Sequence, residues 1–327
     1  MALGLGLQLP ALADLRNRVA LVLERNKLVN RRIGRVLGVA GFEVRAVEEP
    51  ERLEPDVCSD GALVLADAFD VDLVTRLLAS RPACEAVLYS GEPVDRLLPR
   101  AAEEPRLRAL VGRAGFEVAP RESDLLMLAR LAESNAEAPA LEAHLSWGAR
   151  ISAFRLTELA HRDPAVAEVM AFVTRLGAPK RVGDMLGELT HELIMNALYD
   201  APVDASGQPR FAHDRKAEVR LDTADAALLR VGSDGMRVAV EVTDRFGRLT
   251  REHVFGGIHR ALASGQIDAA GGGAGLGMMV AYRSTTALYF DVIPGRRTRV
   301  IGLFDLDLNL REFRLLPKTL HFPRPRS

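Results

Sequence analysis

The sequence predicts an α/β fold in two parts, a parallel sheet followed by a sandwich of helices on an antiparallel sheet. Between residues 17 and 120, short apolar runs alternate with segments of helical periodicity, which is typical of a doubly wound parallel sheet. After residue 180, alternating apolar and polar segments surround turn signals, which predicts β-hairpins. At 327 residues, the chain is long enough to bury two cores of ordinary size.

The first part, residues 17–120, is expected to alternate strands with helices. We expect strands over 19–23, 42–47, 62–66 and 86–90, and helices over 28–39 and 71–80. In a doubly wound sheet, functional groups gather where the strands end at their carboxyl edge. In this sequence those ends carry Glu24-Arg25-Asn26, Asp67, Ser90-Gly91 and Gly112-Arg113.

These polar groups follow the order found in the receiver domains of response regulators, which residues 17–120 resemble. The resemblance implies a flavodoxin-like fold, with Asp67 as the phosphoacceptor and Ser90 as the hydroxyl residue. Glu24-Arg25 replaces the acidic pair of a working receiver, and Arg113 stands where a lysine is expected. A guanidinium in place of an oxygen ligand opposes Mg²⁺ binding. We therefore expect a pseudo-receiver in which Asp67 is not phosphorylated by the Mg²⁺-dependent route; the alternative role for Asp67 is a strand-end cap.

Residues 121–180 are expected to form a helical connector. Apolar residues recur three and four apart, at positions 125, 128 and 131 and again at 145, 151, 154 and 156. This pattern fits a dimerisation segment as well as ordinary packing against the second part. Trp147 is expected to anchor a core. His144 and His161 lack the Glu-x-Arg-x-Pro type of pattern that marks the phosphoacceptor of sensor kinases, so we expect solvated histidines on a helix face.

The second part, residues 181–312, begins with an expected helix over 187–201, in which Glu192 and Asn196 lie four apart and therefore on one face. Two hairpins are expected, with strands over 228–231 and 236–243, and over 287–293 and 298–303. Between them we expect a helix over 251–263 and another that begins near Leu276. Residues 1–16 and 313–327 are expected to be an N-terminal extension and an irregular tail.

A glycine run, Gly271-Gly-Gly-Ala-Gly-Leu-Gly277, lies between these last two helices. Without Cβ atoms, such a segment can bring several backbone N–H groups close to an anion, and a helix N-terminus after it adds partial positive charge. The run alone also fits a flexible linker. Its position after Glu192-x-x-x-Asn196 and Asp244-x-x-Gly247, and before Thr298, favours a nucleotide site.

The order of these four motifs resembles the GHKL superfamily of gyrase, Hsp90, histidine-kinase and MutL type ATPases, and within it the anti-sigma-factor kinases. The resemblance implies a Bergerat α/β sandwich that binds ATP or ADP with Mg²⁺. It implies that Glu192 orients or deprotonates the attacking group and that Asn196 binds Mg²⁺. It also implies that Asp244 and Thr298 recognise adenine and that Gly247 leaves room for the ring. The phosphate lid would be formed by Gly273, Gly275 and Gly277. Asp200 stands near the expected phosphates, and charge repulsion there predicts slow or absent catalysis.

Composition restricts the remaining functions. The formal net charge is −1, so no overall field recruits nucleic acid or an anionic membrane. No apolar stretch approaches the ~20 residues that cross a bilayer, and we expect a cytoplasmic protein with no membrane span. The two cysteines, Cys58 and Cys84, have no metal-ligand spacing and are expected to be buried and reduced.

The leading functional hypothesis is a cytosolic signalling regulator that binds ATP and Mg²⁺ in its second part and contacts a protein partner through the pseudo-receiver. One alternative is a protein serine/threonine kinase of the anti-sigma-factor type, with Glu192 as the base. Another is a non-enzymatic scaffold with a vestigial ATP site. Weak ATPase activity and a homodimer are both compatible with the sequence.

Overall fold

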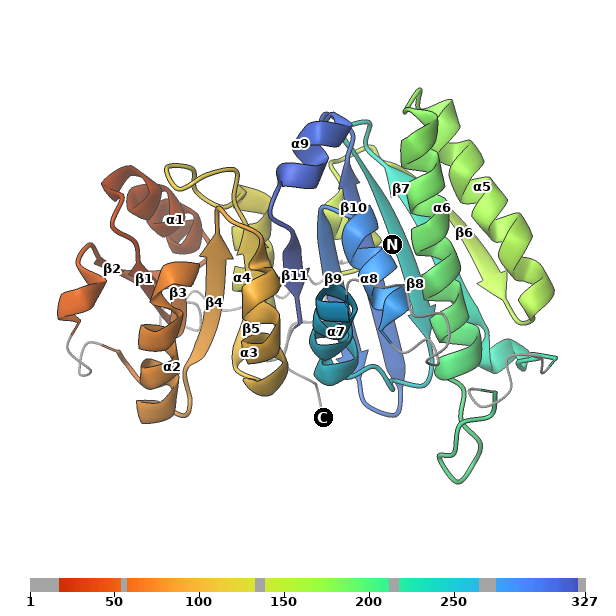
Figure 1. The fold of residues 1–327 in the computed structure, drawn as a ribbon, viewed down its shortest axis with the longest axis horizontal. Coiled ribbons are helices and arrows are strands. Elements are labelled where there is room, and N and C mark those ends of the chain that lie inside the picture. Colours follow the sequence, from red (N-terminus) through yellow and green to blue (C-terminus); the bar gives the residue numbers. More distant parts are fainter. Residues whose placement is uncertain (1–17, 54–57, 133–138, 212–217, 265–274, 323–327) are drawn as a thin grey trace, which may run out of the picture.

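The computed structural model describes residues 18–53, 58–132, 139–211, 218–264 and 275–322. An eleven-stranded mixed sheet runs through the whole molecule, in the order β2-β1-β3-β4-β5-β11-β9-β10-β8-β7-β6 (Figure 1). Helices cover both faces of this sheet. The predicted α/β class is therefore confirmed.

Five parallel strands make up the first half of the sheet, in the doubly wound order β2-β1-β3-β4-β5. They are β1 (Arg18–Leu23), β2 (Phe42–Val47), β3 (Leu63–Asp67), β4 (Glu85–Ser90) and β5 (Leu107–Gly112). One face packs against α1 (Lys27–Val39) and α4 (Glu122–Leu131), the other against α2 (Val71–Ser80) and α3 (Leu98–Glu103). The four strands and two helices that periodicity predicts here are confirmed to within one residue at each end.

Five antiparallel strands make up the other half, in the order β9-β10-β8-β7-β6. They are β6 (Arg150–Leu156), β7 (Ala227–Ser233), β8 (Arg237–Asp244), β9 (Ala287–Ile293) and β10 (Arg297–Asp305). The helices α5 (Arg162–Arg175), α6 (Lys180–Met195), α7 (Gly257–Ser264) and α8 (Leu276–Ser284) lie over one face of this half (Figure 1). Both predicted hairpins, β7–β8 and β9–β10, are confirmed.

The C-terminal segment corrects the prediction of an irregular tail over 313–327. It contains the end of α9 (Leu310–Leu315) and the short strand β11 (Thr319–His321). Strand β11 pairs antiparallel with β5 and parallel with β9, and it thereby joins the two half-sheets into one. Its residues are buried, because the strand closes the gap between two apolar sheet edges.

The connector, residues 121–180, also differs from the prediction. Residues 150–156, expected to be helical, form the edge strand β6, because pairing with β7 overrides the local spacing of apolar residues. Trp147, expected in a core, has a relative exposure of 102% on a turn before β6. His144, expected on a solvated helix face, is buried beside Tyr289 of β9.

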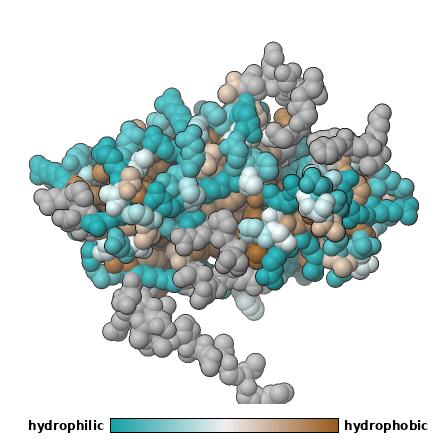
Figure 2. All heavy atoms as spheres, turned by 90° about the horizontal axis from the view of Figure 1, so that it is seen from below, coloured by the Kyte–Doolittle hydropathy of each residue, from teal (hydrophilic) through white to brown (hydrophobic). Residues whose placement is uncertain are grey.

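A continuous apolar core runs along one face of the sheet, from α2 and α3 in the first half to α6 and α8 in the second. Cys58 and Cys84 belong to it as free thiols, with their Sγ atoms 3.5 Å apart. The outer face drawn in Figure 2 is mostly hydrophilic, with smaller groups of apolar residues among the charged ones. Among the described residues, no helix has the length and apolar character needed to cross a membrane.

Candidate functional site

Asp244 is a buried carboxylate at the end of β8, with a relative exposure of 6%. Its Oδ1 accepts hydrogen bonds from the backbone N–H of Phe246 at 2.8 Å and of Gly247 at 3.3 Å. Burial raises the pKa of Asp244 above its usual value, and the two amide donors oppose that shift. The side chain is therefore fixed in orientation by its own turn.

Thr298 lies directly opposite Asp244 in the β8–β10 pairing. Its hydroxyl is buried beside the carboxylate, and its proximity helps the two amides to oppose the rise in the pKa of Asp244. The pair thus places a carboxylate acceptor next to a hydroxyl, which can both donate and accept, and this fits a small ligand with adjacent donor and acceptor atoms.

Gly247 takes a left-handed backbone conformation with φ +63°. A Cβ atom at this position would collide with the carbonyl oxygen of Ile293 and crowd the N–H groups of Gly295 and Arg296. The structure therefore gives this glycine a packing reason, which is the close approach of the β9–β10 turn. Its expected role of leaving room for a ring stays a prediction.

Glu192 and Asn196 lie at the end of α6, where the helix passes into a π-helical turn, Asn196–Asp200. Both side chains are partly buried, and Asp200 at the end of the turn is exposed. The Glu192 carboxylate lies so close to Gly277, in the first turn of α8, that a Cβ atom there would collide with it. Single π-helical turns of this kind are frequent at functional sites.

Gly275 is the N-cap residue of α8, with φ +125°. Its backbone packs directly against Gly257 at the start of α7, where a side chain on either residue would be crowded. The two helices on either side of the glycine run are thereby held together at their N-terminal ends. Gly273, predicted to belong to a phosphate lid, lies outside the described residues.

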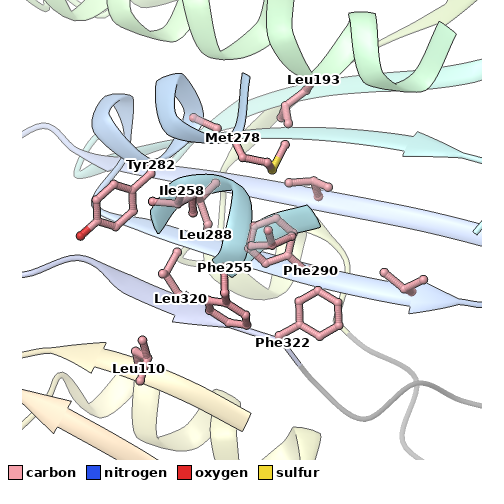
Figure 3. Packing of buried hydrophobic residues seen from close by; sticks show 14 of the residues in the cluster. Leu110, Leu193, Phe255, Ile258, Met278, Tyr282, Leu288, Phe290, Leu320 and Phe322 are labelled. Atoms are coloured by element: carbon pink, nitrogen blue, oxygen red, sulfur yellow. The ribbon is translucent and has the colours of Figure 1, made fainter. Parts of the chain in front are cut away.

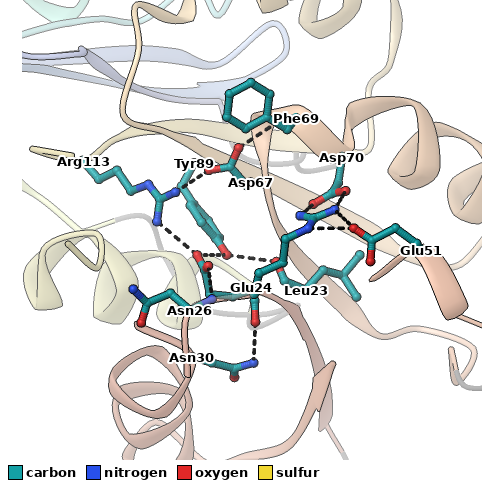
Figure 4. A network of polar contacts seen from close by, with 11 residues as sticks. Leu23, Glu24, Asn26, Asn30, Glu51, Asp67, Phe69, Asp70, Tyr89 and Arg113 are labelled. Carbon is teal, nitrogen blue, oxygen red and sulfur yellow. Dashed lines mark hydrogen bonds and ion pairs between the residues drawn. The ribbon is translucent and has the colours of Figure 1, made fainter. Parts of the chain in front are cut away.

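A second polar cluster occupies the carboxyl edge of the parallel strands, where the sequence predicts one (Figure 4). Arg113, which follows β5, is buried between two carboxylates. Its Nη1 lies 3.0 Å from Glu24 Oε2 and its Nη2 lies 2.6 Å from Asp67 Oδ2. Tyr89 packs its ring against the guanidinium and donates its hydroxyl to Glu24 at 3.0 Å.

The acceptor oxygens of Asp67 are both occupied in this cluster. Oδ1 accepts the Phe69 N–H at 2.9 Å, and Oδ2 binds Arg113. Burial raises the pKa of Asp67, while the Phe69 amide and the Arg113 charge oppose the shift. Arg25, in the place of an acidic residue, binds Asp70 through two hydrogen bonds of 2.7 and 2.8 Å. The Arg113 guanidinium therefore fills the space between Glu24 and Asp67, while the Arg25 guanidinium is paired separately with Asp70 and Glu51.

Several polar residues make contacts between the two halves that the sequence analysis did not predict. Arg251 precedes α7, Tyr282 lies in α8, and both bond to the first half. The ring of Tyr289 lies between those of His144 and His321, with centroids 4.3 and 4.4 Å away; it is stacked on His321 and tilted against His144. The position of Tyr282 within an apolar helix is the one feature of the sequence that indicates its burial. The contacts of these residues could not be predicted, because they depend on how the two halves pack together.

Comparison with known proteins adds a distant structural similarity. No protein-family model matches this chain, and no curated protein matches it. A chain in the crystal structure of the SiaB–SiaC complex from Pseudomonas aeruginosa is similar to it at 11% sequence identity and a TM-score of 0.34, over 47% of this chain and 90% of that one. A TM-score of this size supports no conclusion about function, so the proposal below depends on the geometry.

Proposed function

We propose that this protein is a cytosolic signalling regulator that binds ATP or ADP with Mg²⁺ in a GHKL-like second half. The observation that carries the proposal is the buried pair Asp244 and Thr298. A fixed carboxylate can accept a hydrogen bond from the exocyclic amine of adenine, and the Thr298 hydroxyl can donate to the neighbouring ring nitrogen. This arrangement gives a role to a buried acid and a buried hydroxyl that lie opposite each other on adjacent strands.

The other end of the nucleotide would lie between α6 and α8. The N-terminus of α8 supplies partial positive charge for phosphate, and Asn196 supplies a side-chain oxygen for Mg²⁺. When bound, the metal would neutralise phosphate charge. No group of three or more acidic, cysteine or histidine side chains among the described residues is arranged to hold a metal, so the phosphates and water would complete the coordination.

Calorimetry with two nucleotides tests the adenine site. Inosine triphosphate carries a carbonyl in place of the adenine amine, so it should lose the hydrogen bond to Asp244. We expect wild-type protein with Mg²⁺ to bind ATP at least about tenfold more tightly than inosine triphosphate, as one lost hydrogen bond to a charged group predicts. Equal affinities would place the base elsewhere, and no binding of either nucleotide would favour the scaffold alternative.

The first half would act as a pseudo-receiver that contacts a protein partner without phosphorylation. Arg113 supports this part of the proposal, because it neutralises Glu24 and Asp67 at the place of the metal. After incubation with acetyl phosphate and Mg²⁺, intact-mass spectrometry should show no phosphate adduct on Asp67. A stoichiometric adduct would mean that the half is a working receiver.

Phosphoryl transfer is the second candidate function, and the position of Glu192 favours it. The carboxylate lies against the first turn of α8, within the region assigned to the phosphates. A general base must lie near the attacking group. Transfer of radiolabel from ATP to a partner protein that is abolished in Glu192→Gln would support a kinase. Binding of ATP without transfer would favour the signalling regulator.

A further inference from the structure

The segments on either side of the glycine run 271–277 contact either α3 of the first half or the turn that leads into α3. The π-helical turn Glu252–Gly256, which leads into α7, packs against α3. Helix α8 reaches the turn Val94–Leu97, which leads into α3. The two sides of the proposed phosphate site are therefore linked to one helix of the parallel half.

Arg251 makes the first of these links. Its guanidinium donates to three backbone carbonyls at the C-terminal end of α3 and the start of β5: Ala101, Glu104 at 3.2 Å and Leu107 at 2.8 Å. It also donates to the carbonyl of Phe322, after β11, at 3.4 Å. One side chain thus holds together the end of α3, strand β5 and the segment that follows β11.

The surroundings of Arg251 make this link stiff. The guanidinium lies over the rings of Phe255 and Phe322, 4.9 and 5.2 Å from their centroids. Burial lowers the pKa of Arg251 to about 10, so the group stays charged at neutral pH. A charged group in such a setting makes strong hydrogen bonds, and movement of the turn before α7 would break several at once.

Tyr282 makes the second link, from α8. Its hydroxyl donates to Asp95 Oδ1 at 2.6 Å, and the side chain has a relative exposure of only 6%. An apolar cluster fills the space between the two links (Figure 3). In it, Phe255 and Ile258 of the α7 region pack with Leu320 of β11, whose neighbour in the first half is Leu110 of β5.

We propose that nucleotide binding in the second half is coupled to α3 of the first half through Arg251 and Tyr282. The inference rests on the proposed nucleotide site. A phosphate group at the N-terminus of α8 would favour one position of α7 and α8, whose N-terminal ends touch at Gly257 and Gly275. Because both helices bond to α3 and the turn before it, that preference reaches the parallel half. By linkage, a partner that binds α3 changes the affinity for ATP by the same factor.

Hydrogen exchange of the full-length protein, with and without Mg²⁺ and ATP, tests the coupling. In the wild type, we expect ATP to change exchange rates in peptides covering residues 94–104 by about fivefold or more, the lower end of usual coupling factors. In Tyr282→Phe, which removes only the hydroxyl, the ATP-dependent change should fall below about twofold. Asp95→Ala should behave like Tyr282→Phe, because both variants remove the same hydrogen bond.

A matched control is Thr174→Val in α5, which removes an exposed hydroxyl that donates within its own helix. It should keep the full ATP-dependent change over residues 94–104. Calorimetry on each variant separates the outcomes. If ATP binds normally but leaves residues 94–104 unchanged, or if Tyr282→Phe retains the full change, the coupling is wrong while the nucleotide site stands. If the wild type binds no ATP, both proposals fall.

Discussion

Two buried acids, Asp67 at the end of β3 and Asp244 at the end of β8, lie one in each half-sheet and have different partners. Asp67 is bonded to the Arg113 guanidinium, so its charge is neutralised inside the protein. Asp244 accepts from two neutral backbone amides and has the Thr298 hydroxyl beside it, with no cation among its partners in the described part of the chain. The carboxylate of Asp67 is occupied by a guanidinium, whereas the carboxylate of Asp244 can still accept a hydrogen bond from a ligand. That difference is the basis for assigning binding of the nucleotide to the second half.

Removing the guanidinium of Arg113 should strongly destabilise the protein. Arg113→Ala would leave Glu24 and Asp67 buried without their shared cation, and breaking such a buried pair costs about 3–5 kcal/mol. Urea unfolding measures the loss. Arg52→Ala, which removes an exposed pair with Glu49, is the control and should change little. Equal effects of the two variants would contradict the role given to Arg113.

Gly247 should tolerate no side chain. Gly247→Ala adds a Cβ atom against the Ile293 carbonyl at a positive φ, so we expect a loss of about 3 kcal/mol or more in the free energy of unfolding. Gly235→Ala is matched in backbone conformation, with φ +86°, but has open space around its Cβ. It should cost about 1–2 kcal/mol. Thermal unfolding of both variants shows whether the crowding matters.

His321 should make the stability depend on pH. Burial lowers its pKa to about 3, and neither ring nitrogen has a hydrogen-bond partner among the described residues. The unfolded state therefore binds the proton more readily. Stability should be fully present above pH ~6.5 and fall as the pH drops from there towards 3, by at most about 1.4 kcal/mol per pH unit. His144, whose pKa burial lowers to about 4, acts in the same direction.

The variant His321→Phe keeps a ring against Tyr289 and removes the titrating group. Urea unfolding between pH 7 and pH 4.5 should then show a flatter loss of stability than in the wild type. An unchanged slope would mean that the histidine gains its proton without cost in the folded state.

At the scale of elements, the sequence predicts what local pattern determines. The parallel strands and both hairpins follow from apolar runs and turn residues, and the ends of β3, β5 and β8 place Asp67, Arg113 and Asp244 correctly. Strands β6 and β11 could not be predicted in this way. Strand β6 pairs with residues 71 to 83 positions away in the chain, so no local pattern announces the pairing. Strand β11 has only three residues, all buried, and these carry too little pattern to identify a strand.

Strand β11 should contribute to stability as a core element. Leu320 has no exposed surface and lies between β5 and β9, so Leu320→Ala should cost about 2–5 kcal/mol by leaving a cavity. Leu315, at the end of α9, has a relative exposure of 70%. Leu315→Ala is therefore the matched control and should change the urea midpoint little. Similar losses of stability in both variants would mean that β11 does not contribute to the core and behaves as an irregular tail.

At the scale of the whole molecule, the two parts predicted from the sequence share one sheet. The boundaries at 17–120 and 181–312 stay predictions, since β11 and the apolar core cross between the halves. This union could not be predicted, because it depends on a C-terminal strand that docks between distant edges. The shared sheet and core are the physical basis of the coupling that we propose between the second half and α3.

The most direct measurement is a crystal structure of the full-length protein with Mg²⁺ and ADP or an ATP analogue. We expect the adenine amine within hydrogen-bond distance of the Asp244 carboxylate, the Thr298 hydroxyl beside the ring, and the metal next to Asn196. A nucleotide bound elsewhere, or an Asp244–Thr298 pair without a base at saturating nucleotide, would contradict this expectation.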